Sequence, residues 1–201
     1  MTVATPEAPP AALPPRKPRK IFLVVGLVAA VALGIGLFTS IGAPKKSGIP
    51  QPGDPVPTFT AARVNGSGTV RVGAHGGSSG GPTVLLFFGH WCSICSTELP
   101  RLAATVRSQD AAGGALSRIR VLGVDSEDPL SVAQSFVADS GVTFPVAYDP
   151  DVAIMSGKFY FEGDPYAVFV KSDGTIDKIV GSAIAPAKFT AYERALIPSG
   201  S

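Results

Sequence analysis

The chain has 201 residues, of which 45% are hydrophobic and 16% charged, and its formal net charge is +2. Residues 1–46 hold six Lys or Arg and one acidic residue, so this segment carries +5 and the rest of the chain carries −3. A mildly acidic folded part excludes nucleic-acid binding that rests on positive charge, and we expect no nucleic-acid partner. The length is enough for one domain with a sizeable core and additional segments.

The first 41 residues carry a membrane signal. Residues 1–20 are rich in Pro and Ala and end in a basic cluster, so we predict a disordered tail. Residues 21–38 are apolar and uncharged, and with residues 39–41 they reach the roughly 20 residues that span a bilayer. We therefore predict a transmembrane helix at 21–41. Four basic residues precede it and two follow it, which predicts a single-pass protein of the cell membrane with a cytoplasmic N-terminus and an extracytoplasmic domain.

Two alternatives to this anchor are a cleaved signal peptide and a buried core helix. The apolar stretch is longer than the roughly 7–15 residues of a signal-peptide core, and Ile41, Gly42 and Ala43 form a poor cleavage site. A core helix is disfavoured because the stretch has no polar face. Lipoprotein processing would need a cysteine just after the stretch, and the sequence has none there.

The rest of the chain has the pattern of a linker followed by one α/β domain. Residues 42–57 are rich in Pro and Gly and predict an extended linker, and the domain is predicted at 58–197, opening with a hairpin at 58–72. The periodicity and the turn residues predict strands at 83–88, 119–124, 144–147, 166–170 and 176–180, and helices at about 93–109, 128–140, 151–157 and 186–196. This order indicates a mixed central sheet flanked by helices, with an N-terminal β-hairpin.

The chain has only two cysteines, Cys92 and Cys95, and they lie where the strand at 83–88 turns into a helix. Unpaired N–H groups and a partial positive charge at the first turn of a helix stabilise a thiolate, which is the reactive form of cysteine. A dithiol at this position can attack a disulfide with one sulfur and resolve the mixed disulfide with the other. Any disulfide within the chain must join these two residues, and disulfides persist outside the cytoplasm.

The chain resembles the thioredoxin-fold family, specifically its membrane-anchored TlpA/ResA-type thiol–disulfide oxidoreductases. The resemblance covers roughly residues 52–196 and rests on Trp91-Cys92-x-x-Cys95-x-x-Glu98-x-Pro100, on Gly163-x-Pro165 before a strand, and on Asp173-Gly174 before the next strand. It implies a thioredoxin-like fold and a redox-active disulfide without a cofactor. Cys92 is then the exposed nucleophile and Cys95 the resolving thiol.

The resemblance also implies roles for residues around the dithiol. Glu98 would lie by the active site and influence thiol ionisation, and Pro165 would be cis and pack against the dithiol. Trp91, Asp164 and Pro165 would form the substrate-binding surface, where the backbone before Pro165 pairs with client chains. The spacing supports a role for Glu98, since it follows Cys95 by three residues and shares its helix face. A partly buried carboxylate there would have a raised pKa and could accept a proton from Cys95; the alternative is a solvated glutamate that the helix dipole stabilises.

The chain departs from the family pattern at several positions. Leu86 stands where thioredoxin has a buried aspartate, and Ser93 and Ile94 replace the Pro or His of better-known members. Asp164 is acidic where the family usually has an apolar or hydroxyl residue. A carboxylate there would oppose formation of the thiolate and favour a reductant. His90 could favour the thiolate, or it could be an ordinary exposed histidine.

We therefore expect a membrane-anchored, extracytoplasmic thiol–disulfide oxidoreductase that reduces exported proteins. The resemblance suggests apocytochrome c as a client and a membrane thiol protein as the electron partner, and we expect a monomer. The alternatives are a disulfide-forming oxidant of the same fold, and a copper-delivery or other metal-binding module. No metal is expected, because the related copper modules have Cys-x-x-x-Cys and a distant histidine, and two Cys with two His are too few for zinc. Peroxidase chemistry would need Thr-x-x-Cys, where this chain has Gly89. A purely structural disulfide is disfavoured because so short a loop adds little stability.

Overall fold

The computed structural model describes residues 48–73, 76–77 and 81–197. The predicted tail at 1–20 and the predicted membrane span at 21–41 lie outside these residues. Among the helices that the structure does describe, none combines the length and the apolar character needed to cross a bilayer.

A five-stranded mixed sheet lies at the centre of the domain. Its strands, in order across the sheet, are β6 (Val146–Asp149), β5 (Arg120–Ser126), β4 (Thr83–Phe88), β7 (Tyr166–Val170) and β8 (Ile176–Val180). Strands β4, β5 and β6 are parallel, whereas β7 runs antiparallel to both of its neighbours. The predicted mixed sheet is confirmed, and the strands predicted at 166–170 and 176–180 have the observed bounds.

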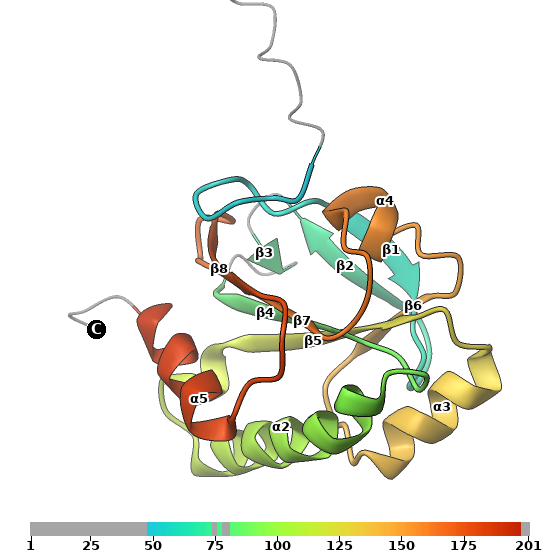
Figure 1. Ribbon diagram of the computed structural model, residues 1–201. Coiled ribbons are helices and arrows are strands. Elements are labelled where there is room, and N and C mark those ends of the chain that lie inside the picture. The colour runs from blue at the N-terminus through green and yellow to red at the C-terminus, as the bar shows by residue number, and fades with distance from the viewer. Residues whose placement is uncertain (1–47, 74–75, 78–80, 198–201) are drawn as a thin grey trace, which may run out of the picture. The chain divides into compact units, whose positions relative to one another are not determined.

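Two layers cover the faces of this sheet (Figure 1). One face carries the helices α2 (Ser93–Ala112), α3 (Leu130–Asp139) and α5 (Pro186–Ala195), and a 3₁₀ turn at Leu116–Arg118 leads from α2 to β5. The other face carries α4 (Met155–Phe159) and a small antiparallel sheet of β1 (Phe59–Ala62), β2 (Thr69–Gly73) and β3 (Gly76–Gly77). The predicted N-terminal hairpin is thus formed by β1 and β2, and β3 adds a third strand.

Strand β4 contributes to the hydrophobic cores on both faces. Val84, Leu86 and Phe88 belong to the core beneath the helices, whereas Leu85 and Phe87 belong to the core beneath the hairpin. Successive side chains of a strand point to opposite faces, so an uninterrupted apolar run is what a strand buried on both sides requires.

Part of the segment predicted as a linker is bonded to the domain. The N–H groups of Gly53 and Val56 donate to the carbonyls of Ile176 and Gly174 at 2.8 and 2.9 Å, and Val56 is buried. A Pro-rich composition is typical of a linker, but it does not reveal bonds to the turn and strand at 174–176, which come much later in the chain.

The carboxyl ends of the parallel strands position the site. Strands β4, β5 and β6 end at the same edge of the sheet, and α2 begins there, five residues after the end of β4. Segments that are distant in sequence therefore meet around the two cysteines.

Candidate active site

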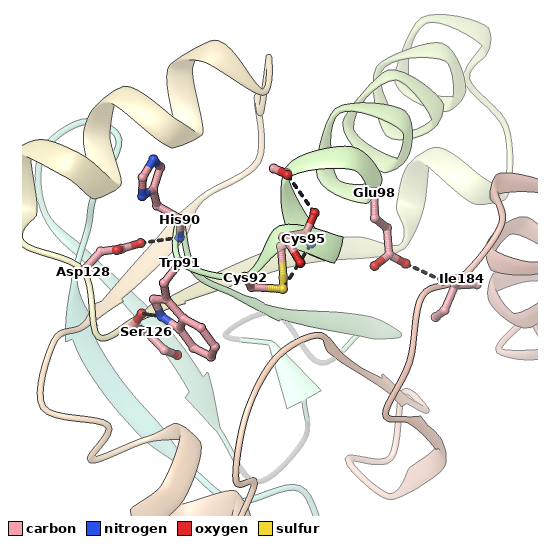
Figure 2. The surroundings of a disulfide bond; sticks show 10 residues. His90, Trp91, Cys92, Cys95, Glu98, Ser126, Asp128 and Ile184 are labelled. Carbon is pink, nitrogen blue, oxygen red and sulfur yellow. Dashed lines mark hydrogen bonds between the residues drawn. A yellow bond between two sulfur atoms is a disulfide. The ribbon is translucent and has the colours of Figure 1, made fainter.

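Cys92 and Cys95 form a disulfide at the N-terminus of α2 (Figure 2). Cys92 is the N-cap residue of the helix, and the backbone N–H of Cys95 donates to its Sγ at 3.1 Å. In this disulfide form the residues are only 5% and 1% exposed, respectively. The expected exposed nucleophile is therefore nearly covered while it is oxidised, although Cys92 remains the more accessible of the two. The N–H donor at its sulfur would also stabilise a Cys92 thiolate once the bond is reduced.

Two large apolar side chains flank the disulfide at the surface. Trp91 is 45% exposed and Ile94 is 49% exposed. The indole Nε1–H of Trp91 donates to the Ser126 carbonyl at 3.0 Å, which fixes the ring at the end of β5 (Figure 2). An exposed aromatic ring that is held in place offers contact area to a client chain at low entropic cost.

Asp128 holds the segment before the cysteines from the other side. Its Oδ2 accepts a hydrogen bond from the backbone N–H of His90 at 2.6 Å (Figure 2). Sequence analysis did not identify Asp128 or Ser126 as parts of the site. The signal that could have found them is their place at the end of β5 (Ser126) and just after it (Asp128), because the carboxyl ends of parallel strands meet at one edge of the sheet.

Glu98 is buried at the first turns of α2, with 9% of its surface exposed. Burial raises the pKa of its carboxyl group, and a hydrogen bond from the backbone N–H of Ile184 opposes that rise (Figure 2). This environment favours the predicted partly buried carboxylate over the solvated glutamate.

Glu98 and Cys95 line the same small cavity. Its volume is about 20 Å³, and its lining also includes Pro165, Ser182 and Ile184. The lining is mostly apolar, and the volume has room for about one water molecule, for which the Glu98 carboxyl and the Ser182 hydroxyl are the polar partners on the wall. The structure thus brings Cys95, Glu98 and Pro165 together, and the Asp164–Pro165 peptide bond is cis as the resemblance implied.

Asp164 has a buried carboxyl group that interacts with several other acidic residues. Both of its carboxyl oxygens are buried and accept no hydrogen bond from any residue that the structure describes. Burial, followed by the charges of Glu127, Asp128 and Asp149, raises its pKa to about 7. Asp164 is therefore about half protonated near neutral pH.

Asp125, at the end of β5, belongs to the same group of acids. It is fully buried, and neither of its carboxyl oxygens has a hydrogen-bond partner among the described residues. Burial, with the charges of Asp128 and Asp164, raises its pKa to about 8. Asp125 is therefore largely protonated at neutral pH.

His90 lies apart from the cavity. Its ring meets Phe136 edge-on with 5.8 Å between centroids, and it borders an open groove between α2 and α3. Among the described ranges, no group of three or more His, Cys, Asp or Glu has an arrangement that could hold a metal ion.

Comparisons with known proteins support the resemblance. Residues 52–179, more than half of the chain, match the AhpC/TSA family. Thiol-disulfide oxidoreductase ResA of Bacillus subtilis (strain 168) is 24% identical over 185 residues, which cover 91% of this chain and 97% of ResA. Soluble secreted antigen MPT53 of Mycobacterium tuberculosis (strain ATCC 25618 / H37Rv) is 28% identical over 96 residues, which cover 48% of this chain and 51% of that protein.

Solved structures share the fold. A secreted Mycobacterium tuberculosis disulfide oxidoreductase homologous to E. coli DsbE superimposes with a TM-score of 0.56 at 26% identity, covering 69% of this chain and 96% of that one. Gly89 still occupies the position where peroxidase chemistry would need threonine, so family membership does not restore that alternative. The chain belongs to the AhpC/TSA family, and within it this thioredoxin-like protein with a Cys92-x-x-Cys95 pair is homologous to the ResA-type thiol–disulfide oxidoreductases.

Proposed function

We propose that this protein is a membrane-anchored thiol–disulfide oxidoreductase that reduces disulfides in exported proteins. The observation that carries the proposal is the Cys92–Cys95 disulfide at the start of α2, with Glu98 and cis-Pro165 on one cavity beside it. A dithiol at a helix N-terminus supplies the thiolate that thiol–disulfide exchange needs, the buried acid can accept a proton, and the exposed tryptophan offers a contact surface.

In the proposed reaction, the Cys92 thiolate attacks one sulfur of a client disulfide. A Cys92–client mixed disulfide forms, and the other client sulfur leaves as a thiolate. The Cys95 thiolate then attacks Cys92 Sγ, which re-forms the Cys92–Cys95 disulfide and releases the second client thiolate. Two electrons pass to the client, and its two thiolates take up protons from solvent or from the site.

Glu98 accepts the proton of Cys95 in this scheme. The raised pKa of the buried carboxyl brings it closer to that of a thiol, which makes the transfer less unfavourable than it is to a solvated glutamate. The cavity that both residues line is large enough for one bridging water, so direct contact between them is not required.

The direction of the reaction follows from the charge near the nucleophile. An ionised Asp164 opposes a Cys92 thiolate, which disfavours the reduced form relative to the disulfide and makes the site more reducing. The pKa of about 7 means that this effect operates from neutral pH upwards. A reductant in the extracytoplasmic space needs electrons from a membrane thiol partner, and apocytochrome c is a client class that suits such a reductant. A redox titration measures the reduction potential of the dithiol, and an oxidising potential would instead support a disulfide-forming oxidant.

The proposed location rests on the apolar segment at 21–41 and its flanking charges. In intact cells or spheroplasts, a membrane-impermeant thiol reagent should label reduced Cys92. Labelling that occurs only after lysis would show that the domain faces the cytoplasm.

A trapping experiment tests the catalytic roles. With Cys95→Ala in the full-length chain, Cys92 can attack a client but the mixed disulfide cannot be resolved, so client adducts should accumulate and disappear on adding dithiothreitol. Cys92→Ala is the matched control and should trap nothing. Adducts through Cys95 in that control would reverse the two roles, and adducts in neither variant would refute the proposed function.

A further inference from the structure

The turn between β5 and α3 holds the short segment that leads into Cys92. Two hydrogen bonds connect them: Asp128 Oδ2 accepts from the backbone N–H of His90 at 2.6 Å, and the Ser126 carbonyl accepts from Trp91 Nε1 at 3.0 Å (Figure 2). The partners are 38 residues apart in sequence in the first bond and 35 residues apart in the second. The backbone of His90 and the side chain of Trp91 are therefore fixed from outside their own segment.

The same segment is also closed from within. The N–H of Cys92 donates to the Gly89 carbonyl at 3.1 Å. A Cβ atom on Gly89 would lie 2.4 Å from Trp91 Nε1 and 2.8 Å from the Ser126 carbonyl oxygen. Only glycine leaves the space that the indole needs to reach this carbonyl.

Asp128 is well suited to hold a backbone group in place. Its surface is only 4% exposed, so the carboxylate has little freedom to exchange its partner for water. Hydrogen bonds from a backbone N–H to a carboxylate are shorter and stronger than those between neutral groups. The His90 N–H lies two residues before Cys92, so this bond restrains the backbone that leads into the nucleophile.

We propose that Asp128 is a positioning residue for Cys92, acting through the hydrogen bond that its carboxylate oxygen accepts from the His90 backbone. It does not touch the reacting sulfur. It sets the path of residues 89–91, and so the exposure of Trp91 and the orientation of the Cys92 sulfur at the rim of the site.

A competing explanation is that Asp128 acts only through its charge. Its charge raises the pKa of both Asp125 and Asp164, so removing it would also change the electrostatics near the dithiol. Two substitutions separate the explanations. Asp128→Asn keeps an acceptor oxygen in place and removes the charge, whereas Asp128→Glu keeps the charge and moves the oxygens by one methylene group.

The test uses the full-length chain with Cys95→Ala, so that Cys92 is the only thiol. The rate of exchange with oxidised glutathione is measured from pH 5 to 10. The plateau at high pH, where Cys92 is fully ionised, reports orientation, and the midpoint reports charge. Acrylamide quenching of fluorescence reports the exposure of Trp91, which is the only tryptophan in the chain.

If Asp128 positions the segment, Asp128→Glu and Asp128→Ala lower the plateau rate by about tenfold, since small misplacements of a reacting atom cost one to two orders of magnitude. Both substitutions also raise Trp91 quenching. Asp128→Asn keeps the plateau within about threefold of the parent and leaves quenching unchanged. Asp139→Asn, which removes an exposed acid from the groove that His90 borders, is the matched control and changes neither quantity.

The opposite order, in which Asp128→Glu matches the parent in plateau rate and quenching and Asp128→Asn does not, would overturn the proposal. Asp128 would then act through its charge alone. An Asp128→Ala variant that keeps both the plateau and the quenching would also overturn it. If the alanine variant does not fold, the comparison of Asn with Glu still decides, with circular dichroism to confirm that both are folded. A parent chain whose Cys92 does not react with oxidised glutathione would instead count against the proposed function, so the two failures are distinguishable.

Discussion

Replacing Asp164 by Asn should make the dithiol less reducing, and the size of the change should depend on pH. Asn has nearly the same shape as Asp and carries no charge at any pH. With a pKa of about 7, the parent carboxyl is about one-tenth ionised at pH 6, half ionised at pH 7 and nine-tenths ionised at pH 8. Only the ionised form opposes the Cys92 thiolate. The difference between parent and variant should therefore be small at pH 6, about half its full size at pH 7 and nearly complete at pH 8.

The assay is equilibration of the full-length chain with reduced and oxidised glutathione at these three pH values. At pH 8 the Asn variant should have the less negative reduction potential, since loss of the carboxylate stabilises the reduced form. Alkylation of Cys92 against pH should show a lower thiol pKa in the variant. Glu162→Gln is the matched control: it removes an exposed carboxylate two residues earlier, whose charge solvent screens.

A constant difference across pH 6 to 8 would refute the proposed titration of Asp164. Identical potentials for parent and variant at all three values would mean that the carboxyl is not coupled to the dithiol. The proposed direction of the reaction would then lose its physical basis.

Two further predictions concern buried glutamates. Glu98→Gln keeps an oxygen that can accept a hydrogen bond from the Ile184 N–H, so the fold should persist. The amide cannot take a proton, so the pH dependence of thiol reactivity should shift and resolution of a mixed disulfide should slow roughly tenfold. An unchanged pH profile would mean that Glu98 has a purely structural role. Glu193 is fully buried, and its pKa is raised to about 7, mainly by burial. The folded state therefore holds this proton more tightly than the unfolded state, and the stability of the domain falls as pH rises from about 4.5 to 7. Glu193→Gln should weaken this decline and raise the free energy of unfolding at pH 8 by about 1–3 kcal/mol relative to the parent, measured by urea unfolding at pH 5 and 8; equal stability of the two proteins at pH 8 would contradict it.

The central part of the fold could be predicted because its signals are local. The apolar run at 83–88, the Gly break and the Cys-x-x-Cys pair specify a buried strand followed by a helix without reference to any distant residue. The helix α2 ends at Ala112, slightly later than predicted, since no strong stop signal precedes Gly113. The turn residues at 173–174 likewise predicted where β7 ends and where β8 begins.

The parts that sequence analysis missed depend on contacts between distant segments. In the sequence, Asp128 is a polar residue at the start of a predicted helix. Nothing in the adjacent residues indicates that it accepts a hydrogen bond from the His90 backbone N–H. The pKa of Asp164 depends on Glu127, Asp128 and Asp149, which come from the ends of two other strands. A sequence gives the identity of such groups but not their proximity, which arises only when parallel strands end at one edge.

The acids at this edge connect the stability of the domain to the charge of its site. The carboxyls of Asp125 and Asp164 are buried and have no hydrogen-bond partner among the described residues, so the folded state tolerates them mainly in the neutral form. Their pKa values, raised to about 8 and 7, mean that the folded state holds these protons more tightly than the unfolded state, so stability falls as pH rises from about 4, where the unfolded carboxyls ionise, to about 8. In the proposed function, ionisation of folded Asp164 around pH 7 also opposes the Cys92 thiolate and favours the disulfide over the dithiol. Rising pH should therefore lower the stability of the domain from about pH 4 upwards and increase its reducing strength around pH 7, and substituting Asp164 by Asn should weaken both responses.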